Sequence, residues 1–113
     1  MENQSAVARA PREKNRVPFG AGAYCDVFQT DQIKCGVLTV PAGRKAGYDA
    51  GHVDIDEVFY IAEGEATIEF PGLGKTAVAK AGEFVLIPRS QAHVVSNRKE
   101  QDLKLVYASC EKV

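Results

Sequence analysis

The feature that most constrains the fold of this chain is a rhythm of short hydrophobic runs. From Val17 onward, β-branched, aromatic and aliphatic residues form short runs that Gly and Pro separate, a pattern typical of antiparallel strands joined by turns. The sequence predicts strands at residues 24–29, 34–40, 58–62, 66–70, 76–79, 84–87, 93–96 and 103–109. It predicts no long helix. Eight short strands indicate an all-β sandwich or barrel.

Alternation of side-chain character predicts which face of these strands is buried. Ala66, Ile68 and Phe70 alternate with polar residues, as in a half-buried antiparallel strand. Leu103 and Leu105 repeat the pattern near the C-terminus. We therefore expect one shared hydrophobic core.

The length of the chain indicates a single domain. A chain of 113 residues can build one hydrophobic core but has no room for a separate substrate domain. Residues 1–16 are polar, and Pro11 interrupts any helix there, so we expect a flexible arm or an edge strand. Residues 17–113 are predicted to form the β-barrel domain.

Charge and cysteine content narrow the classes of partner. The formal net charge of -1 comes from interspersed acids and bases, which argues against a nucleic-acid or membrane partner and favours a small-molecule ligand or substrate or a protein partner. No secretory or membrane-spanning segment is evident, so we expect a cytoplasmic protein. Cys25, Cys35 and Cys110 lack CxxC spacing, which predicts reduced thiols instead of a disulfide framework or a thiolate zinc site.

Both histidines of the chain lie in spaced patterns with Glu, Gly, Pro and Asn. In the first stretch, four residues separate His52 from Glu57 and six separate Glu57 from Gly64. The second stretch runs from Gly82 through Pro88, Ser90 and His93 to Asn97. Together they resemble the two motifs of the cupin superfamily, G-x5-H-x-H-x3-4-E-x6-G and G-x5-P-x-G-x2-H-x3-N.

The chain departs from the two motifs at three positions. Ala50 stands where the family has its first histidine, and Arg44 stands where the first motif opens with glycine. In the second motif Ser90 replaces a glycine. Because Ser90 falls in a predicted turn, we interpret it as a change of turn conformation, with a hydroxyl facing the pocket as the alternative.

The resemblance implies a cupin double-stranded β-barrel of the jelly-roll type with a metal inside. Carried over position by position, the ligands are His52, Glu57 and His93. Small cupins commonly pair as homodimers, and the arm and edge strands give a physical reason to expect a homodimer here.

The chemistry of these side chains is consistent with one divalent metal ion. Two imidazoles and a carboxylate can bind one face of iron, manganese, nickel, zinc or copper and leave positions open for water, substrate or dioxygen. Ala50 offers no lone pair, so the site works with three ligands, recruits a neighbour, or has lost its metal. Tyr48 and Asp54 are the candidate replacements.

Three further residues are predicted to line the site. Tyr48 is the candidate catalytic proton donor, and Gln91 and Phe59 are candidate substrate contacts because they share strand parity with His93 and Glu57. For Phe59 the alternative is ordinary core packing, and for Gln91 it is a surface amide.

The sequence thus favours a small metal-binding cupin that acts on a small polar organic acid or sugar derivative as an isomerase, lyase or oxygenase. The first alternative is a non-catalytic sensor that binds a small ligand in the same cavity. The second is a structural barrel with a lost metal site.

Overall fold

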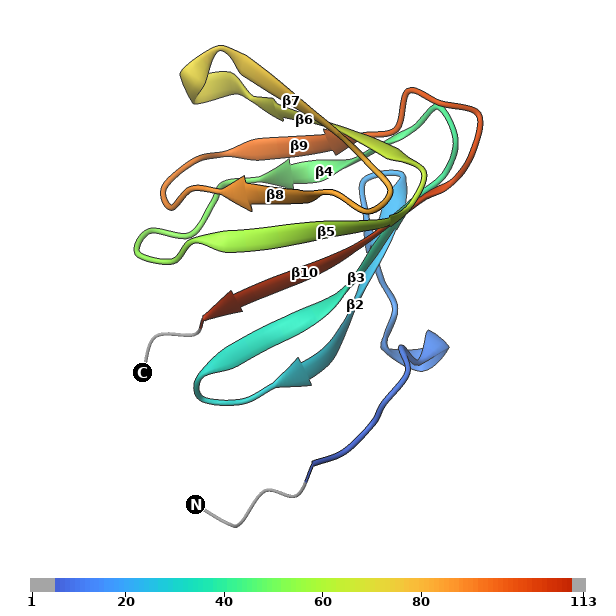
Figure 1. Cartoon of the computed structure of the whole chain (residues 1–113), viewed down its shortest axis with the longest axis vertical. Coiled ribbons are helices and arrows are strands. Elements are labelled where there is room, and N and C mark those ends of the chain that lie inside the picture. Colours follow the sequence, from blue (N-terminus) through green and yellow to red (C-terminus); the bar gives the residue numbers. More distant parts are fainter. Residues whose placement is uncertain (1–5, 111–113) are drawn as a thin grey trace.

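The described part of the protein is built from ten antiparallel strands in two sheets (Figure 1). The structure, a computed structural model, describes residues 6–110. In chain order its elements are η1 (Glu13–Asn15), β1 (Val17–Phe19), β2 (Gly22–Gln29), β3 (Ile33–Val40), β4 (Lys45–Asp49), β5 (Glu57–Glu63), β6 (Glu65–Phe70), η2 (Pro71–Leu73), β7 (Lys75–Lys80), β8 (Phe84–Ile87), β9 (His93–Ser96) and β10 (Leu103–Cys110).

The chain alternates between the two sheets, as in a jelly roll. One sheet has six strands in the order β1-β2-β3-β10-β5-β8, and the other has four in the order β4-β9-β6-β7. From β3 onward the chain changes sheet at almost every connection, so strands distant in sequence become neighbours. The predicted all-β, jelly-roll cupin fold is confirmed.

Every predicted strand is present, and the structure adds two strands that the sequence pattern missed. β1 contains Pro18, which cannot donate to a strand ladder, and it lies at the edge of its sheet. β4 carries a single exposed large apolar side chain, Tyr48, and its other members are charged or small. Neither segment has the hydrophobic alternation that identifies a strand.

The hydrophobic core lies between the inner faces of the two sheets. Its fully buried members include Val40, Ile61, Ile68, Leu103 and Leu105, drawn from both sheets. The alternation predicted for the last strand is confirmed, because buried and exposed residues alternate along all of β10. These apolar side chains fill one end of the barrel, and polar side chains line the other end.

Residues 6–16 run along the outside of the barrel and are exposed. Arg9 donates to the carbonyl oxygen of Val27 (3.0 Å) and stacks over the Phe28 ring, 4.7 Å from its centroid. Residues 1–5 and 111–113 lie outside the described residues, so the boundary of the arm and the end of the barrel domain stay predictions. Within residues 6–110, no helix has the length and apolar character needed to cross a membrane.

Candidate functional site

A cavity of about 310 Å³ opens at the polar end of the barrel. Along the inner face of β10 the side chains change from apolar to polar. Leu103 and Leu105 lie in the core, whereas Tyr107 and Ser109 line the cavity. Its volume is at the lower end of the range for small-molecule pockets, which indicates a small ligand.

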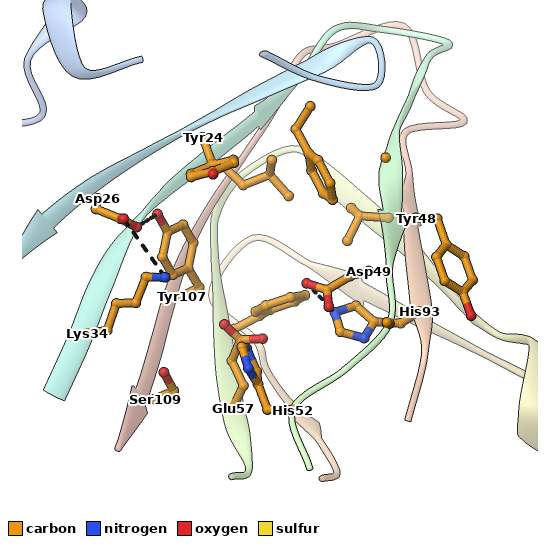
Figure 2. Close-up of a pocket in the computed structure, with 16 residues that line it drawn as sticks. Tyr24, Asp26, Lys34, Tyr48, Asp49, His52, Glu57, His93, Tyr107 and Ser109 are labelled. Carbon is orange, nitrogen blue, oxygen red and sulfur yellow. Dashed lines mark hydrogen bonds and ion pairs between the residues drawn. The ribbon is translucent and has the colours of Figure 1, made fainter. Parts of the chain in front are cut away.

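Three side chains from three strands form a candidate metal centre in this cavity. Asp49 ends β4, Glu57 begins β5 and His93 begins β9, and one donor atom of each lies within 4.8 Å of the others. The pairing of β4 with β9 sets Asp49 directly opposite His93. Asp49 Oδ2 therefore lies 3.6 Å from His93 Nε2 (Figure 2).

Backbone contacts orient both of these side chains. His93 Nδ1 lies 3.0 Å from the carbonyl oxygen of Gln91, and because a carbonyl only accepts, this ring nitrogen carries the proton. The lone pair of the neutral imidazole is then on Nε2, which faces Asp49. Asp49 Oδ1 accepts from the amide of Gly51 at 2.8 Å, which leaves Oδ2 directed at the histidine. Outer contacts of this kind fix metal-binding histidines and carboxylates in many proteins.

Gly51 makes this arrangement possible. Its φ of +88° is in the left-handed region, and a Cβ there would lie 2.6 Å from the carbonyl oxygen of Gln91. The same carbonyl accepts from His93, so a side chain at Gly51 would displace the group that orients the imidazole.

Aromatic rings enclose the imidazole. The ring centroids of Phe59 and Phe70 lie 5.9 Å and 6.1 Å from that of His93, and all three residues are buried. Burial strengthens electrostatic interactions at the centre, because it excludes water from one side of the donors.

These donors fit a divalent metal. One imidazole and two carboxylates from separate strands converge on one point, and Glu57 and His93 are buried at 8% and 2% exposure. The Asp49 side chain is 35% exposed, and two carboxylates this close together repel each other unless a cation or a proton lies near them. A ligand set rich in oxygen suits manganese or iron better than copper, which prefers softer donors.

The structure brings some predicted residues to the site and places others elsewhere. His52, Glu57, Phe59 and His93 all line the cavity. Among the described residues the converging donor group contains Asp49 where the prediction had His52. Asp49 was missed because the prediction searched for a ligand on the strand face that Ala50 shares with His52, two residues later.

The strand alternation that the prediction followed from His52 back through Ala50 does not hold in the structure. β4 ends at Asp49, and Gly51, with φ at +88°, interrupts the extended backbone between Asp49 and His52. The pairing of Asp49 with His93 places the Asp49 side chain in the lining of the cavity. Tyr48 also lines the cavity, but it is 64% exposed and its side chain points away from the centre in Figure 2. The sequence did contain a signal for this ligand, since Asp49 is an acidic residue next to Ala50, where the family has its first histidine.

Gln91 contributes through its backbone. Its carbonyl oxygen orients His93, and its side-chain Oε1 lies toward Gly72, 3.6 Å from where a Cβ on that glycine would be. The amide group is therefore directed at the 71–73 turn.

The loop that carries His52 is attached to the loop of the second motif. Ser90 donates through its amide to the His52 carbonyl (2.6 Å) and through Oγ to the Val53 carbonyl (2.8 Å). With φ at 63°, Ser90 keeps the left-handed conformation that glycine favours, and its hydroxyl is bonded to the adjacent loop. Arg89 hydrogen-bonds Asp56 and thereby holds the pKa of that carboxyl below its usual range.

A second polar cluster, which the sequence did not predict, lies across the cavity (Figure 2). Tyr107 donates its hydroxyl proton to Asp26 Oδ1 at 2.6 Å, and Lys34 Nζ lies 3.9 Å from Asp26 Oδ2. Burial, followed by the hydrogen bond to Asp26, raises the pKa of Tyr107 well above its usual value.

Comparison with known proteins places this architecture in a family. The model of the cupin domain matches residues 36–109. No curated protein sequence matches the chain.

Solved structures share the fold at low sequence identity. The cupin domain of Cnp3 from Schizosaccharomyces pombe superposes with a TM-score of 0.71 at 18% identity over 80% of this chain, and the chain covers 64% of that one, less than two thirds. A predicted oxalate decarboxylase from Thermotoga maritima gives 0.69 at 17% identity, with 89% and 97% of the two chains covered. A sugar phosphate isomerase of the cupin superfamily from Silicibacter pomeroyi gives 0.67 at 14%, with 80% and 59% covered.

The matched region extends from β3 into β10 and contains Asp49, Glu57 and His93. Since the match covers more than half of the chain and the jelly-roll topology agrees with it, this chain belongs to the cupin domain family.

Proposed function

We propose that this protein is a metal-dependent cupin enzyme that acts on a small polar organic acid or sugar derivative. The observation that carries the proposal is the convergence of Asp49, Glu57 and His93 inside a cavity large enough for a small ligand. His52 lines the same cavity and is proposed as an additional ligand.

The side chains of this protein would hold and tune one divalent metal. When bound, such a metal supplies Lewis acidity that stabilises negative charge developing on a substrate oxygen. Asp49 and Glu57 would balance its charge, and the Gln91 carbonyl would keep the His93 lone pair directed at it. Phe59 and Phe70 would exclude water on the side of the imidazole.

The reaction class we propose is isomerisation, lyase chemistry or oxygenation. Similar folds include proteins described as a predicted oxalate decarboxylase and a sugar phosphate isomerase, and both descriptions name oxygen-rich small molecules. The charged and hydrogen-bonding side chains among the residues that line the present cavity suit a small ligand that carries several oxygen atoms.

Metal analysis of purified protein tests the proposal. We expect near-stoichiometric manganese or iron in the wild type, bound one to one in titrations of the metal-free protein. The variants Asp49→Ala, Glu57→Ala and His93→Ala should each bind metal at least tenfold more weakly. Asp54→Asn is the matched control, since it removes an exposed acid near the site and should leave the affinity unchanged. A wild type that takes up no metal would refute the proposal.

A non-catalytic ligand sensor is the second candidate function. The 64% exposure of Tyr48, the predicted proton donor, favours it, because a side chain that lines the cavity but is turned toward solvent is poorly placed to protonate a ligand. Turnover that survives in Tyr48→Phe would show that this tyrosine is not the proton donor. Ligand binding with no turnover of any organic acid or sugar tested would favour the sensor.

We further propose that the protein is a homodimer in the cytoplasm. The outer face of the six-stranded sheet exposes apolar side chains on β5, β8 and β10, and Phe84 (71% exposed) and Leu86 (60%) lie on β8 at the edge of the sheet. Such a patch with an open strand edge suits pairing with a second copy. Sedimentation should show a dimer that Phe84→Glu converts to a monomer; a monomeric wild type would refute the dimer.

A further inference from the structure

We propose that Asp26, Lys34 and Tyr107 form a second binding subsite, which takes a hydroxyl group of the ligand and makes this a cupin for polyhydroxylated, sugar-like compounds. The assignment of substrate class rests on the proposed function, because it supposes that the other end of the ligand binds at the candidate metal centre. The subsite itself rests on its own geometry.

The three side chains meet on one wall of the cavity. Asp26, Lys34 and Tyr107 come from β2, β3 and β10, which are adjacent strands, and all three line the same cavity as the metal centre. Figure 2 shows them on the opposite side of that cavity from Asp49 and His93. A ligand in the cavity is therefore bounded by both groups.

The donors and acceptors of the cluster match a hydroxyl group. Tyr107 gives its one proton to Asp26, so its oxygen can still accept a hydrogen bond. Lys34 Nζ lies 3.9 Å from Asp26 Oδ2, longer than a hydrogen bond, so the ammonium attracts the carboxylate without binding it tightly. A ligand hydroxyl can donate to Asp26 and accept from Lys34 at the same time.

A carboxylate or phosphate would be a poorer ligand there. Such groups only accept hydrogen bonds, and they would lie beside the negative charge of Asp26. Lys34 and Asp26 together are neutral, and at the other end Asp49 and Glu57 would balance the charge of a divalent metal. The cavity as a whole has no excess positive charge to attract a dianion.

The local sequence is adapted to bring Tyr107 and Asp26 together. In the sheet, Gly36 of β3 pairs with Asp26 on one side and with Tyr107 on the other. A Cβ at Gly36 would lie 2.3 Å from the Tyr107 hydroxyl oxygen, so the tyrosine reaches Asp26 across the space that the missing side chain leaves. Glycine weakens a strand interior by about 1 kcal/mol relative to alanine, and here its absence of a side chain permits the polar contact.

A β-bulge also shapes the subsite. Asp26 pairs with Gly36 and Phe28 with Cys35, which leaves Val27 as an extra residue immediately after Asp26. Bulges commonly redirect a neighbouring side chain at the rim of a barrel and next to an active site.

Two-dimensional amide NMR of the protein, metal-free and Zn²⁺-loaded, tests the subsite directly. D-xylose and xylitol are the polyhydroxylated probes, and succinate is the dicarboxylate probe of similar length. We expect the sugar and the polyol to shift the amides of Lys34, Gly36 and Tyr107, and succinate to bind there more weakly. Lys34→Met should weaken xylose binding roughly tenfold, since hydrogen bonds from charged groups contribute on this order.

Control variants separate the subsite from the metal centre. Lys104→Met removes an exposed lysine that pairs with Glu63 and lies on the opposite face of β10, so it should leave xylose binding unchanged. Lys34→Met should keep wild-type Zn²⁺ affinity, whereas Asp49→Ala should lose it. Tyr107→Phe should weaken xylose binding as well, with its folding checked by thermal melting.

Three outcomes would overturn the subsite: no amide shifts with either polyhydroxylated probe, tighter binding of succinate than of xylose at these amides, or unchanged xylose affinity in Lys34→Met. Failure of the proposed function looks different. The protein would then bind no metal, while the metal-free form would still show xylose shifts at Lys34 and Tyr107.

Discussion

Substitution of Asn97, the last residue of the second motif, should destabilise the fold without removing a metal ligand. Asn97 is 1% exposed and holds three backbone groups. Its Nδ2 donates to the carbonyls of Val40 (3.0 Å) and Gln101 (2.8 Å), and its Oδ1 accepts from the amide of Lys99 (3.0 Å). The side chain thereby connects the ends of β3 and β9 to the loop before β10.

The expected loss follows from the number of these contacts. Asn97→Ala leaves two carbonyls and one amide without their partner, and each unsatisfied buried group costs about 1 kcal/mol or more. The free energy of unfolding should therefore fall by roughly 3 kcal/mol, and the melting temperature by on the order of 10 °C or more.

Urea unfolding followed by circular dichroism measures this change. The control is Arg98→Ala, because Arg98 is the next residue, has a 62% exposed side chain and makes a surface ion pair with Glu69. It should change stability by less than about 0.5 kcal/mol. A loss below about 1 kcal/mol in Asn97→Ala would refute the reasoning, and so would lost metal affinity in protein that is still folded.

Three further predictions follow from single contacts. The raised pKa of Tyr107 stabilises the fold fully below the ordinary tyrosine pKa, and this stability is lost as the pH rises past it, so urea unfolding between about pH 9 and pH 11 should show a steeper loss in the wild type than in Tyr107→Phe. Ser90→Gly relieves a left-handed conformation and loses the bond to the Val53 carbonyl, so its unfolding free energy should change by less than about 1 kcal/mol while the carbonyl carbon chemical shift of Val53 changes; a larger destabilisation would contradict this. Gly36→Ala places a Cβ against Tyr107 and the Cys25 carbonyl and should destabilise by about 2 kcal/mol or more in the same assay, and a neutral result would show that the tyrosine does not need that space.

The metal-centre residues differ in how far the sequence revealed them. Glu57 and His93 were predicted because the two motifs resemble those of the cupin superfamily, and both line the cavity. Asp49 was not predicted, because the prediction continued strand alternation from His52 back through Ala50, whereas the strand ends at Asp49. Alternation along a sequence assumes an uninterrupted strand, and the left-handed conformation of Gly51 breaks that assumption.

The opposite wall of the cavity was beyond the reach of sequence patterns. Asp26 and Tyr107 are 81 residues apart, and a hydrogen bond joins them because β2, β3 and β10 are neighbours in the sheet. In the sequence, Lys34 is only a charged residue at the start of a predicted strand. The sheet order is what places it beside Asp26.

By itself, the sequence determined the class of fold, most strand positions and two of the three converging donors. The strands were predictable because side-chain burial alternates locally along a strand and because turns need particular residues at particular places. The two donors were predicted from the resemblance to the cupin motifs. The tertiary structure decided that Asp49 points inward, that Tyr48 points outward, and that Asp26, Lys34 and Tyr107 meet. Those outcomes depend on strand register and sheet order, which form through contacts between segments far apart in the chain.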